Sequence, residues 1–481
     1  MNLSKETAIG IVVPIILAVM TTMPAQAQKK NSDSDKYRIV LTIEENQDSI
    51  MYMGCYYGKT NYVIDTARRD KKGRFVFSQT DRKLFPGMYF FSNTAGKYVE
   101  FVVYNEEPNF TFETHEDDWT YQMQVKGSQQ NEIFFNYHRL TTRIFREIDE
   151  QRHLLDSAAL QQYYKEANKA ADSIRNAIIA QHPDAMISKI MNATKEVEIP
   201  DTDSTGKKLT ANDRFYYYMD HFFDNMPLNE DMIVRTPKAI FYKRIMYWLD
   251  QALKGAPPEV IIRYVDQAIE KSRTSKETFK WMVHTITEKY LQSPVMIYDE
   301  IYVHMVKKYY ATGDAFWSSP EVVEEQIIRA EKWEKLLVGK TAPELIMKDT
   351  VGTYHSLHAF PHRYKLLIFW SPTCGHCKTM IPDIYKIYKQ YQEDYDIGVY
   401  AILSEPDDHT RVQWKEFIAK HQLDWLNIDG GEANVDWREV YDVVTTPQVY
   451  LMDQDNVIVA KKLNAEIFEN VIKKILVKKN E

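Results

Sequence analysis

Cysteine is scarce in this chain of 481 residues, which contains only Cys55, Cys374 and Cys377. A scaffold held together by disulfides needs several cysteine pairs, and only the last two cysteines are neighbours. A zinc site built on such a pair needs a second pair of ligands, which the distant Cys55 does not supply. The low cysteine count therefore excludes a disulfide-rich scaffold, and we expect no metal site.

An excess of positive charge and a long apolar run are also missing. The formal net charge is -8 at pH 7, so no overall positive field attracts phosphate backbones, and we expect no nucleic-acid partner. The apolar stretch at residues 8–20 is shorter than the roughly 20 residues needed to span a bilayer. No stable membrane span is therefore expected after removal of the N-terminal segment.

That N-terminal segment has the composition of an export signal. Lys5 gives a positive start, residues 8–20 are apolar, and the small residues at 25–27 offer a cleavage site. No cysteine precedes Cys55, so acylation of a cysteine at the new N-terminus is excluded. We predict that residues 1–27 are a signal peptide and that the protein is periplasmic or otherwise exported; retention of the segment as an anchor is the alternative.

Residues 37–127 combine short β-branched and aromatic runs with turn signals such as Lys72-Gly73 and Pro86-Gly87. The runs with strand composition are 37–43, 74–77, 88–92, 98–103 and 109–113. Cys55 alternates with two methionines in another strand-like segment, which indicates a small buried hydrophobic residue. This composition predicts a β-sandwich-like domain, an antiparallel sandwich or small barrel.

From residue 129 the apolar residues recur at helical spacing, and the pattern continues to Trp333. We predict an all-α domain over residues 129–335, with an exposed loop at 201–208. Its helices are expected to break at Pro183, Pro200, Pro237, Pro257-Pro258 and Pro294. Aromatic clusters such as residues 215–218 are interpreted as packing residues rather than a peptide-binding groove.

The last third of the chain, residues 337–481, alternates strands and helices as an α/β unit does. Strands are expected at 364–370, 397–403, 448–452 and 457–461, and helices at 378–395, 410–421 and 465–477. The two neighbouring cysteines lie where the first of these strands enters its helix. The chain is therefore predicted to be multidomain, with the α/β domain last.

Two cysteines separated by two residues at the start of a helix can close a small disulfide ring and exchange it with another thiol pair. Cys374 would lie at the helix N-terminus, where free amides and the helix dipole stabilise a thiolate and lower its pKa. Cys377, one turn later and more buried, would resolve the mixed disulfide. Between them His376 would place positive charge near the thiolate, and Gly375 would let the turn form without strain.

The segment Phe369-Trp370-Ser371-Pro372-Thr373-Cys374-Gly375-His376-Cys377, with Pro382 and Thr446-Pro447 downstream, resembles the active site of the thioredoxin superfamily. It is most similar to the TlpA/ResA-like envelope branch. The resemblance covers roughly residues 337–481 and implies a thioredoxin-like fold, a cis peptide bond before Pro447 and a kinked helix at Pro382. It assigns Thr446, Pro447 and Trp370 to substrate binding and implies no cofactor.

The direction of electron flow stays open. The Cys-Gly-His-Cys motif is similar to that of protein disulfide isomerases, whose potential is about -180 mV against about -270 mV for thioredoxin, so we expect a relatively oxidising couple. Ile368 stands where thioredoxin has a buried aspartate, and Met380 where ResA-like reductases often have a glutamate. Proton transfer to Cys377 therefore lacks an obvious carboxylate, and reductase, isomerase and oxidant roles all fit.

The predicted function is thiol-disulfide oxidoreductase, with Cys374, Cys377 and His376 as catalytic residues. The expected partners are cysteine-containing envelope proteins and a redox partner protein; the sequence does not predict the oligomeric state. Two alternatives are a peroxiredoxin-type peroxidase and a non-enzymatic envelope binding protein that senses redox state. An inert disulfide is a third reading of the cysteine pair. Three histidines, His355, His358 and His362, have helical metal-ligand spacing but are interpreted as solvated loop residues.

Overall fold

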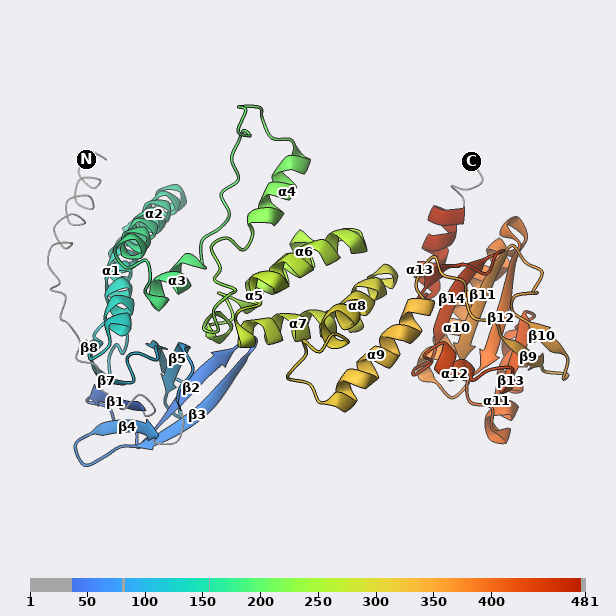
Figure 1. Cartoon of the computed structure of the whole chain (residues 1–481), viewed down its shortest axis with the longest axis horizontal. Helices are drawn as coiled ribbons and strands as arrows, with labels where there is room; N and C mark the ends of the chain where they lie inside the picture. Colours follow the sequence, from blue (N-terminus) through green and yellow to red (C-terminus); the bar gives the residue numbers. More distant parts are fainter. Residues whose placement is uncertain (1–36, 80–82, 155, 477–481) are drawn as a thin grey trace.

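The computed structural model describes residues 37–79, 83–154 and 156–476. A β-rich region, a helical region and an α/β domain follow one another along an elongated molecule (Figure 1). This order confirms the predicted multidomain fold class. The expected signal peptide lies outside the described residues. Within the described ranges, no helix combines the length and the apolar character needed to cross a bilayer.

Two four-stranded sheets form the N-terminal β region. The first has the order β4 (Arg74–Gln79), β1 (Tyr37–Glu44), β7 (Asn109–His115), β8 (Gln124–Lys126). The second has the order β3 (Thr60–Arg68), β2 (Ile50–Tyr57), β5 (Gly87–Ser92), β6 (Tyr98–Val103). Aromatic rings join the sheets face to face, as in the stacked pair Phe77–Phe91 with centroids 5.1 Å apart. The predicted sandwich is therefore present.

The sandwich differs from the expected one in one pairing. Strands β1 and β7 run parallel, whereas the other pairs in the two sheets are antiparallel. The long β2–β3 hairpin was also not fully anticipated, because β3 is an edge strand whose side chains are mostly exposed and carry little apolar alternation. Edge strands of this kind leave a weak sequence signal.

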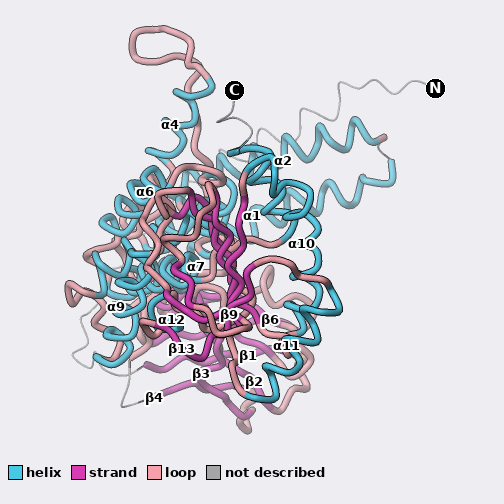
Figure 2. The backbone as a smooth tube through the Cα atoms, turned by 90° about the vertical axis from the view of Figure 1, so that its right-hand side faces the viewer, coloured by secondary structure: helices cyan, strands magenta, loops and turns pink. Residues whose placement is uncertain are grey.

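Nine α-helices follow in the described part of residues 129–335. They are α1 (Gln129–Gln151), α2 (Ser157–Gln181), α3 (Met186–Asn192), α4 (Ala211–His221), α5 (Tyr242–Tyr247), α6 (Pro258–Lys271), α7 (Lys276–Leu291), α8 (Asp299–Met305) and α9 (Pro320–Lys335). The loop over residues 201–208 is exposed as predicted, and it projects with α4 from the rest of the molecule (Figures 1 and 2). The helices and the sandwich share one continuous apolar core, because Phe135 of α1 packs edge-on against Phe112 of β7.

The C-terminal domain contains one seven-stranded sheet. Its order is β10 (Tyr354–Ser356), β9 (Ile346–Asp349), β13 (Leu426–Ala433), β12 (Ile397–Leu403), β11 (Tyr364–Trp370), β14 (Gln448–Asp453), β15 (Ile458–Lys461). Strands β11 and β12 are parallel and buried at every residue, and β14–β15 is the expected closing hairpin. Strands β9, β10 and β13 had not been predicted.

Helices cover both faces of this sheet. Ile368 and Trp370 of β11 face the layer of α10 (Gly375–Tyr395), α11 (Asp408–His421) and α13 (Ala465–Val471). Leu367 and Phe369 face the opposite layer, which contains α12 (Trp437–Val440). This alternation follows from the two-residue period of a strand. It fixes the carboxyl end of β11, and hence the start of α10, between two packed layers.

Candidate active site

The two cysteines lie at the junction of β11 and α10. Cys374 is the N-cap residue of α10, and its carbonyl accepts a hydrogen bond from the Lys378 amide at 3.2 Å. Its own amide donates to the Ser371 carbonyl at 3.2 Å, which closes the turn between strand and helix. Cys374 is half-buried, and Cys377 is completely buried one turn later. No disulfide joins the two thiols in this structure.

The two thiols differ in acidity in the predicted sense. Burial raises the pKa of Cys374. Hydrogen bonds from the thiol and amide of Cys377 and from the Thr446 side chain lower it by more than burial raises it, so the net pKa is below its ordinary value. Burial raises the pKa of Cys377 to about 12, against the opposing hydrogen bond from the Ser371 amide. At neutral pH Cys374 is therefore the available nucleophile, and Cys377 keeps its proton.

A loop from α12 to β14 brings Thr446 and Pro447 to the same place. The Thr446–Pro447 peptide bond is cis, as the resemblance implied. The Cys374 thiol donates to the Thr446 carbonyl at an Sγ–O distance of 3.3 Å. Thr446 and Pro447 are half-buried, so their backbone borders the nucleophile at the surface of the domain.

Two expectations for neighbouring residues are wrong, and a third stays a prediction. Trp370 is fully buried and packs against Phe417 with centroids 5.2 Å apart, because the strand alternation turns it into the core; it is not available to substrate. His376 is exposed, its backbone amide helps to lower the pKa of Cys374, and the catalytic role expected of its side chain stays a prediction. Gly375 has an ordinary φ and open space where a Cβ would lie, so the turn does not require glycine.

The sequence interpretation did not include Glu405, which follows β12. Its Oε2 accepts hydrogen bonds from the hydroxyls of Ser371 and Thr373, each at 2.6 Å. These two bonds lower the pKa of Glu405, with a smaller contribution from the charge of Arg438. The carboxylate thus holds the segment that leads into Cys374. Its position at the carboxyl end of a parallel strand beside β11 is the sequence signal that was overlooked.

The other candidate groups are not part of this site. His355, His358 and His362 are half-buried rather than solvated, since they pair with Asp349, Glu344 and Asp396 respectively. Within the described ranges no group of three or more metal-ligating side chains exists. Cys55 lies in β2, is half-buried and packs against the apolar core, as expected of a small hydrophobic residue; burial raises the pKa of its thiol.

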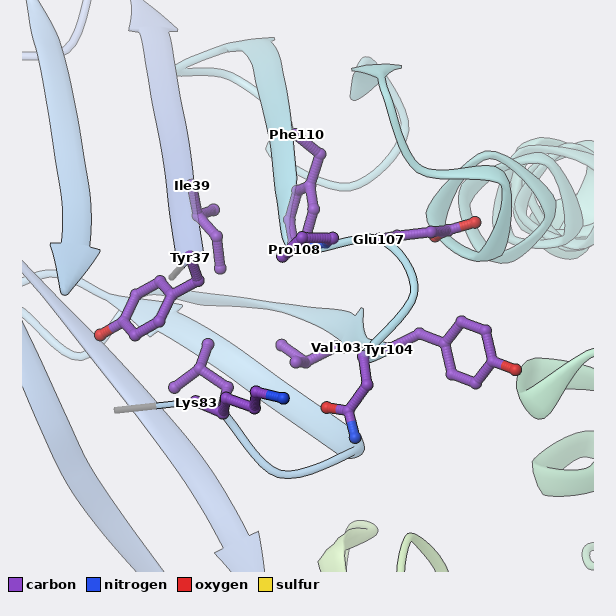
Figure 3. Close-up of a pocket in the computed structure, with 10 residues that line it drawn as sticks. Tyr37, Ile39, Lys83, Val103, Tyr104, Glu107, Pro108 and Phe110 are labelled. Atoms are coloured by element: carbon purple, nitrogen blue, oxygen red, sulfur yellow. The ribbon is translucent and has the colours of Figure 1, made fainter. Parts of the chain in front are cut away.

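A small cavity opens between the sheets of the β region, far along the sequence from the cysteines. Tyr37, Ile39, Pro108 and Phe110 line it with apolar surface (Figure 3). The carboxylate of Glu107 turns away from the cavity towards α1, where it accepts from the Ser128 hydroxyl at 2.6 Å and the Gln129 amide at 3.0 Å. Glu107 therefore caps a helix and does not form part of a catalytic group.

The C-terminal sheet, its helices and the cysteine pair beside a cis-proline define a thioredoxin-like domain of a thiol-disulfide oxidoreductase. Comparison with known proteins agrees: residues 338–461 match the AhpC/TSA family. Residues 37–134 match a domain of unknown function, DUF4369. The first match covers the seven-stranded sheet and both cysteines. The C-terminal domain is thus identified as an AhpC/TSA thioredoxin-like domain, and the protein is an enzyme of the oxidoreductase class.

Curated relatives carry the same assignment. The thiol-disulfide oxidoreductase ResA of Bacillus thuringiensis is 28% identical over 148 residues, which are 30% of this chain and 82% of that protein. The thioredoxin-like protein YneN of Bacillus subtilis is 27% identical over 121 residues, 25% of this chain and 68% of that protein. The aligned part is 30% of this chain or less in both relatives.

Two solved structures resemble parts of this chain. A thioredoxin-like protein from Bacteroides caccae has a TM-score of 0.47 at 18% identity and covers 58% of this chain and 98% of its own. A domain of a possible thiol-disulfide isomerase from Cytophaga hutchinsonii has a TM-score of 0.27 at 33% identity, with 30% of this chain and 97% of that one covered.

Proposed function

We propose that this protein exchanges a dithiol for a disulfide with exported, cysteine-containing proteins through Cys374 and Cys377. The observation that carries the proposal is the contrast between the two thiols. One is half-buried, at a helix N-terminus, with a lowered pKa; the other is buried, with a pKa of about 12. Such a pair separates the attacking role from the resolving role.

The exchange proceeds in two displacements. The Cys374 thiolate attacks one sulfur of a substrate disulfide, the new Sγ–S bond forms, and the other substrate sulfur leaves and takes up a proton. Cys377 then gives up its proton and attacks Cys374 Sγ, which releases the second substrate thiol and leaves a Cys374–Cys377 disulfide. Two electrons have passed to the substrate. A dithiol partner protein restores the reduced pair by the same steps in reverse.

Substrate is placed by the backbone beside the nucleophile. The Thr446 carbonyl already accepts from the Cys374 thiol at 3.3 Å, and the neighbouring peptide groups offer hydrogen bonds to an extended chain. No cofactor is required by this scheme. The exported location is supported by the composition of residues 1–27.

The equilibrium reduction potential of the Cys374/Cys377 couple, measured in glutathione buffers on the C55S chain, is the first test. A value near about -180 mV supports an oxidant or isomerase, and one near or below about -270 mV supports a reductase. C374S abolishes exchange with a disulfide peptide, whereas C377S traps the mixed disulfide. A wild-type pair that does not cycle at all contradicts the proposal and favours an inert disulfide.

A peroxiredoxin-type peroxidase is the second candidate. It is favoured by the AhpC/TSA match and by Pro372-Thr373 immediately before Cys374. Cys377 lies only one helical turn away and is buried, which differs from a remote resolving cysteine. Peroxide consumption by the purified protein, faster than that of the C374S variant, would favour this candidate over protein disulfide exchange.

A further inference from the structure

The helical region contacts the C-terminal domain at the loop that carries Thr446. Helix α9 reaches this domain at its C-terminal end (Figure 1), where the indole Nε1 of Trp333 donates to Asp442 Oδ2 at 2.7 Å. Trp333 is the last aromatic residue before this domain begins, and its ring packs against Tyr302 of α8 with centroids 4.8 Å apart. The donor is therefore held by the helical region, and the acceptor belongs to the loop beside the cysteines.

Asp442 lies near the start of the 441–447 loop, which connects α12 to β14, and makes contacts that hold both ends of this loop. Its side chain is tied to α9, and its backbone carbonyl accepts from Gln448 Nε2 at 3.1 Å, the first residue of β14. Its φ is +48°, in the left-handed region that costs a residue with a side chain some free energy unless contacts compensate. The Trp333 bond is such a contact, made from another part of the molecule.

The far end of the same loop presents the Thr446 carbonyl to Cys374 Sγ at 3.3 Å. The β14–β15 hairpin that continues it is also held by the helical region. Lys461 and Lys462, at the end of β15, make ion pairs with the buried Asp299 of α8 at 2.7 and 2.5 Å. Both ends of the substrate-side backbone are thus anchored to helices outside the thioredoxin-like domain.

We propose that Trp333 is a positioning residue for thiol-disulfide exchange. Through Asp442 it holds the 441–447 loop in the position beside Cys374 in which the Thr446 backbone can pair with a protein substrate. The inference rests on the proposed function. It assigns to the helical region a direct effect on substrate alignment, a role that an isolated thioredoxin-like domain lacks. The effect acts on backbone pairing and leaves the chemistry of the two thiols unchanged.

The test uses the full chain with C55S and two substrates. A peptide with a disulfide in an extended segment requires the Thr446 backbone, whereas the small disulfide dithiobis-nitrobenzoate requires only Cys374. W333F removes one hydrogen bond to a charged group, so we expect kcat/KM for the peptide to fall about tenfold. Neither the rate with the small disulfide nor the reduction potential of the cysteine couple changes.

Further variants separate positioning from general damage. D442G keeps a residue that accepts positive φ but removes the acceptor, so it shows the same loss, and the W333F/D442G double variant loses no more than either single variant. D442N retains an acceptor oxygen and restores the wild-type rate. E439Q breaks the nearby Lys332–Glu439 pair, whose carboxylate is 63% exposed, and serves as the matched control with no effect.

Two results overturn the inference. Either both W333F and D442G keep the wild-type kcat/KM for the peptide, or the two substrates slow equally in both variants. Failure of the proposed function looks different, because the unmodified chain then exchanges with neither substrate and its cysteine couple gives no reversible potential. Circular dichroism melting of each variant confirms that the compared chains are folded.

Discussion

At the scale of single residues, the chemistry depends on the difference in burial and in pKa between two cysteines three positions apart. Cys374 occupies the N-cap of α10 and collects hydrogen bonds that favour its thiolate, while Cys377 is enclosed by core residues. The difference arises because Cys374 caps the start of α10 at the domain surface, whereas Cys377 lies further along the helix, among the core residues.

The first prediction concerns the pH dependence of Cys374. Because the folded chain lowers its pKa, the rate of alkylation by iodoacetamide rises with pH with a midpoint below that of a free cysteine. The reduced fold gains stability as pH rises through this lowered pKa, and loses that contribution as pH falls through it. The measurement is the alkylation rate of the C55S chain from acid to mildly alkaline pH.

The matched control is C55S/C374S, which leaves only Cys377. Its thiol is buried and has a pKa of about 12, so it stays unmodified in the native chain across the same range. A Cys374 midpoint at or above the ordinary cysteine value would contradict the assignment of Cys374 as the nucleophile.

At the scale of elements, the connection from β11 to α10 is held by a side chain from the next strand. Glu405 accepts two hydroxyl hydrogen bonds, and the amide of Ser371 in the same connection points to Cys377. Ser371 thus links Glu405, just after β12, to the resolving thiol of Cys377.

The second prediction follows from this arrangement. In E405A the Ser371 and Thr373 hydroxyls lose their common acceptor, so the connection loosens and resolution by Cys377 slows, by about fivefold for a loss near 1 kcal/mol. Trapping of the mixed disulfide in a quenched-flow experiment measures this step. The initial attack by Cys374 changes less than the resolution step.

Asp424→Asn is the control for this variant, because Asp424 also accepts from neighbouring groups, but these are Lys389 and Tyr385, two turns or more beyond Cys377 on α10. It leaves both steps at the wild-type rate. An E405A variant that resolves as fast as wild type would show that Glu405 has no influence on Cys377.

The same elements show what sequence could predict. Strands β11 and β12 were placed with their observed bounds because they are apolar at nearly every residue and buried throughout. Strand β13 was missed because Gly430-Gly431 resembles a turn, and β9 and β10 because they are short. The cysteine pair was predictable from local spacing, whereas the misassigned Trp370 and the overlooked Glu405 depended on strand facing and on pairing of distant segments.

At the scale of the whole molecule, the domains are joined by buried charge. Asp299 of α8 is 1% exposed and Lys461 of β15 is 5% exposed at the side chain. Burial lowers the pKa of Lys461, and the charge of Asp299 opposes that shift. Lys461 also donates to the Leu336 carbonyl at 3.0 Å, and Lys462 donates to the Ser293 carbonyl at 2.8 Å. The ion cluster is therefore satisfied only when the helical region and the α/β domain are docked.

The third prediction is that breaking this cluster uncouples the domains. D299A leaves Lys461 buried without its counter-charge, which costs about 3 kcal/mol. Because Lys461 regains water when the domains separate, the chemical denaturation curve divides into two transitions, followed by far-ultraviolet circular dichroism and by tryptophan fluorescence.

D299L/K461M replaces the pair by apolar groups and recovers much of the loss, since removing both charges is far less costly than leaving one buried charge unpaired. The exposed Lys389–Asp424 pair within the α/β domain is the control, and D424N leaves the curve unchanged. A D299A chain that unfolds with the wild-type midpoint would mean that the ion cluster does not hold the domains together.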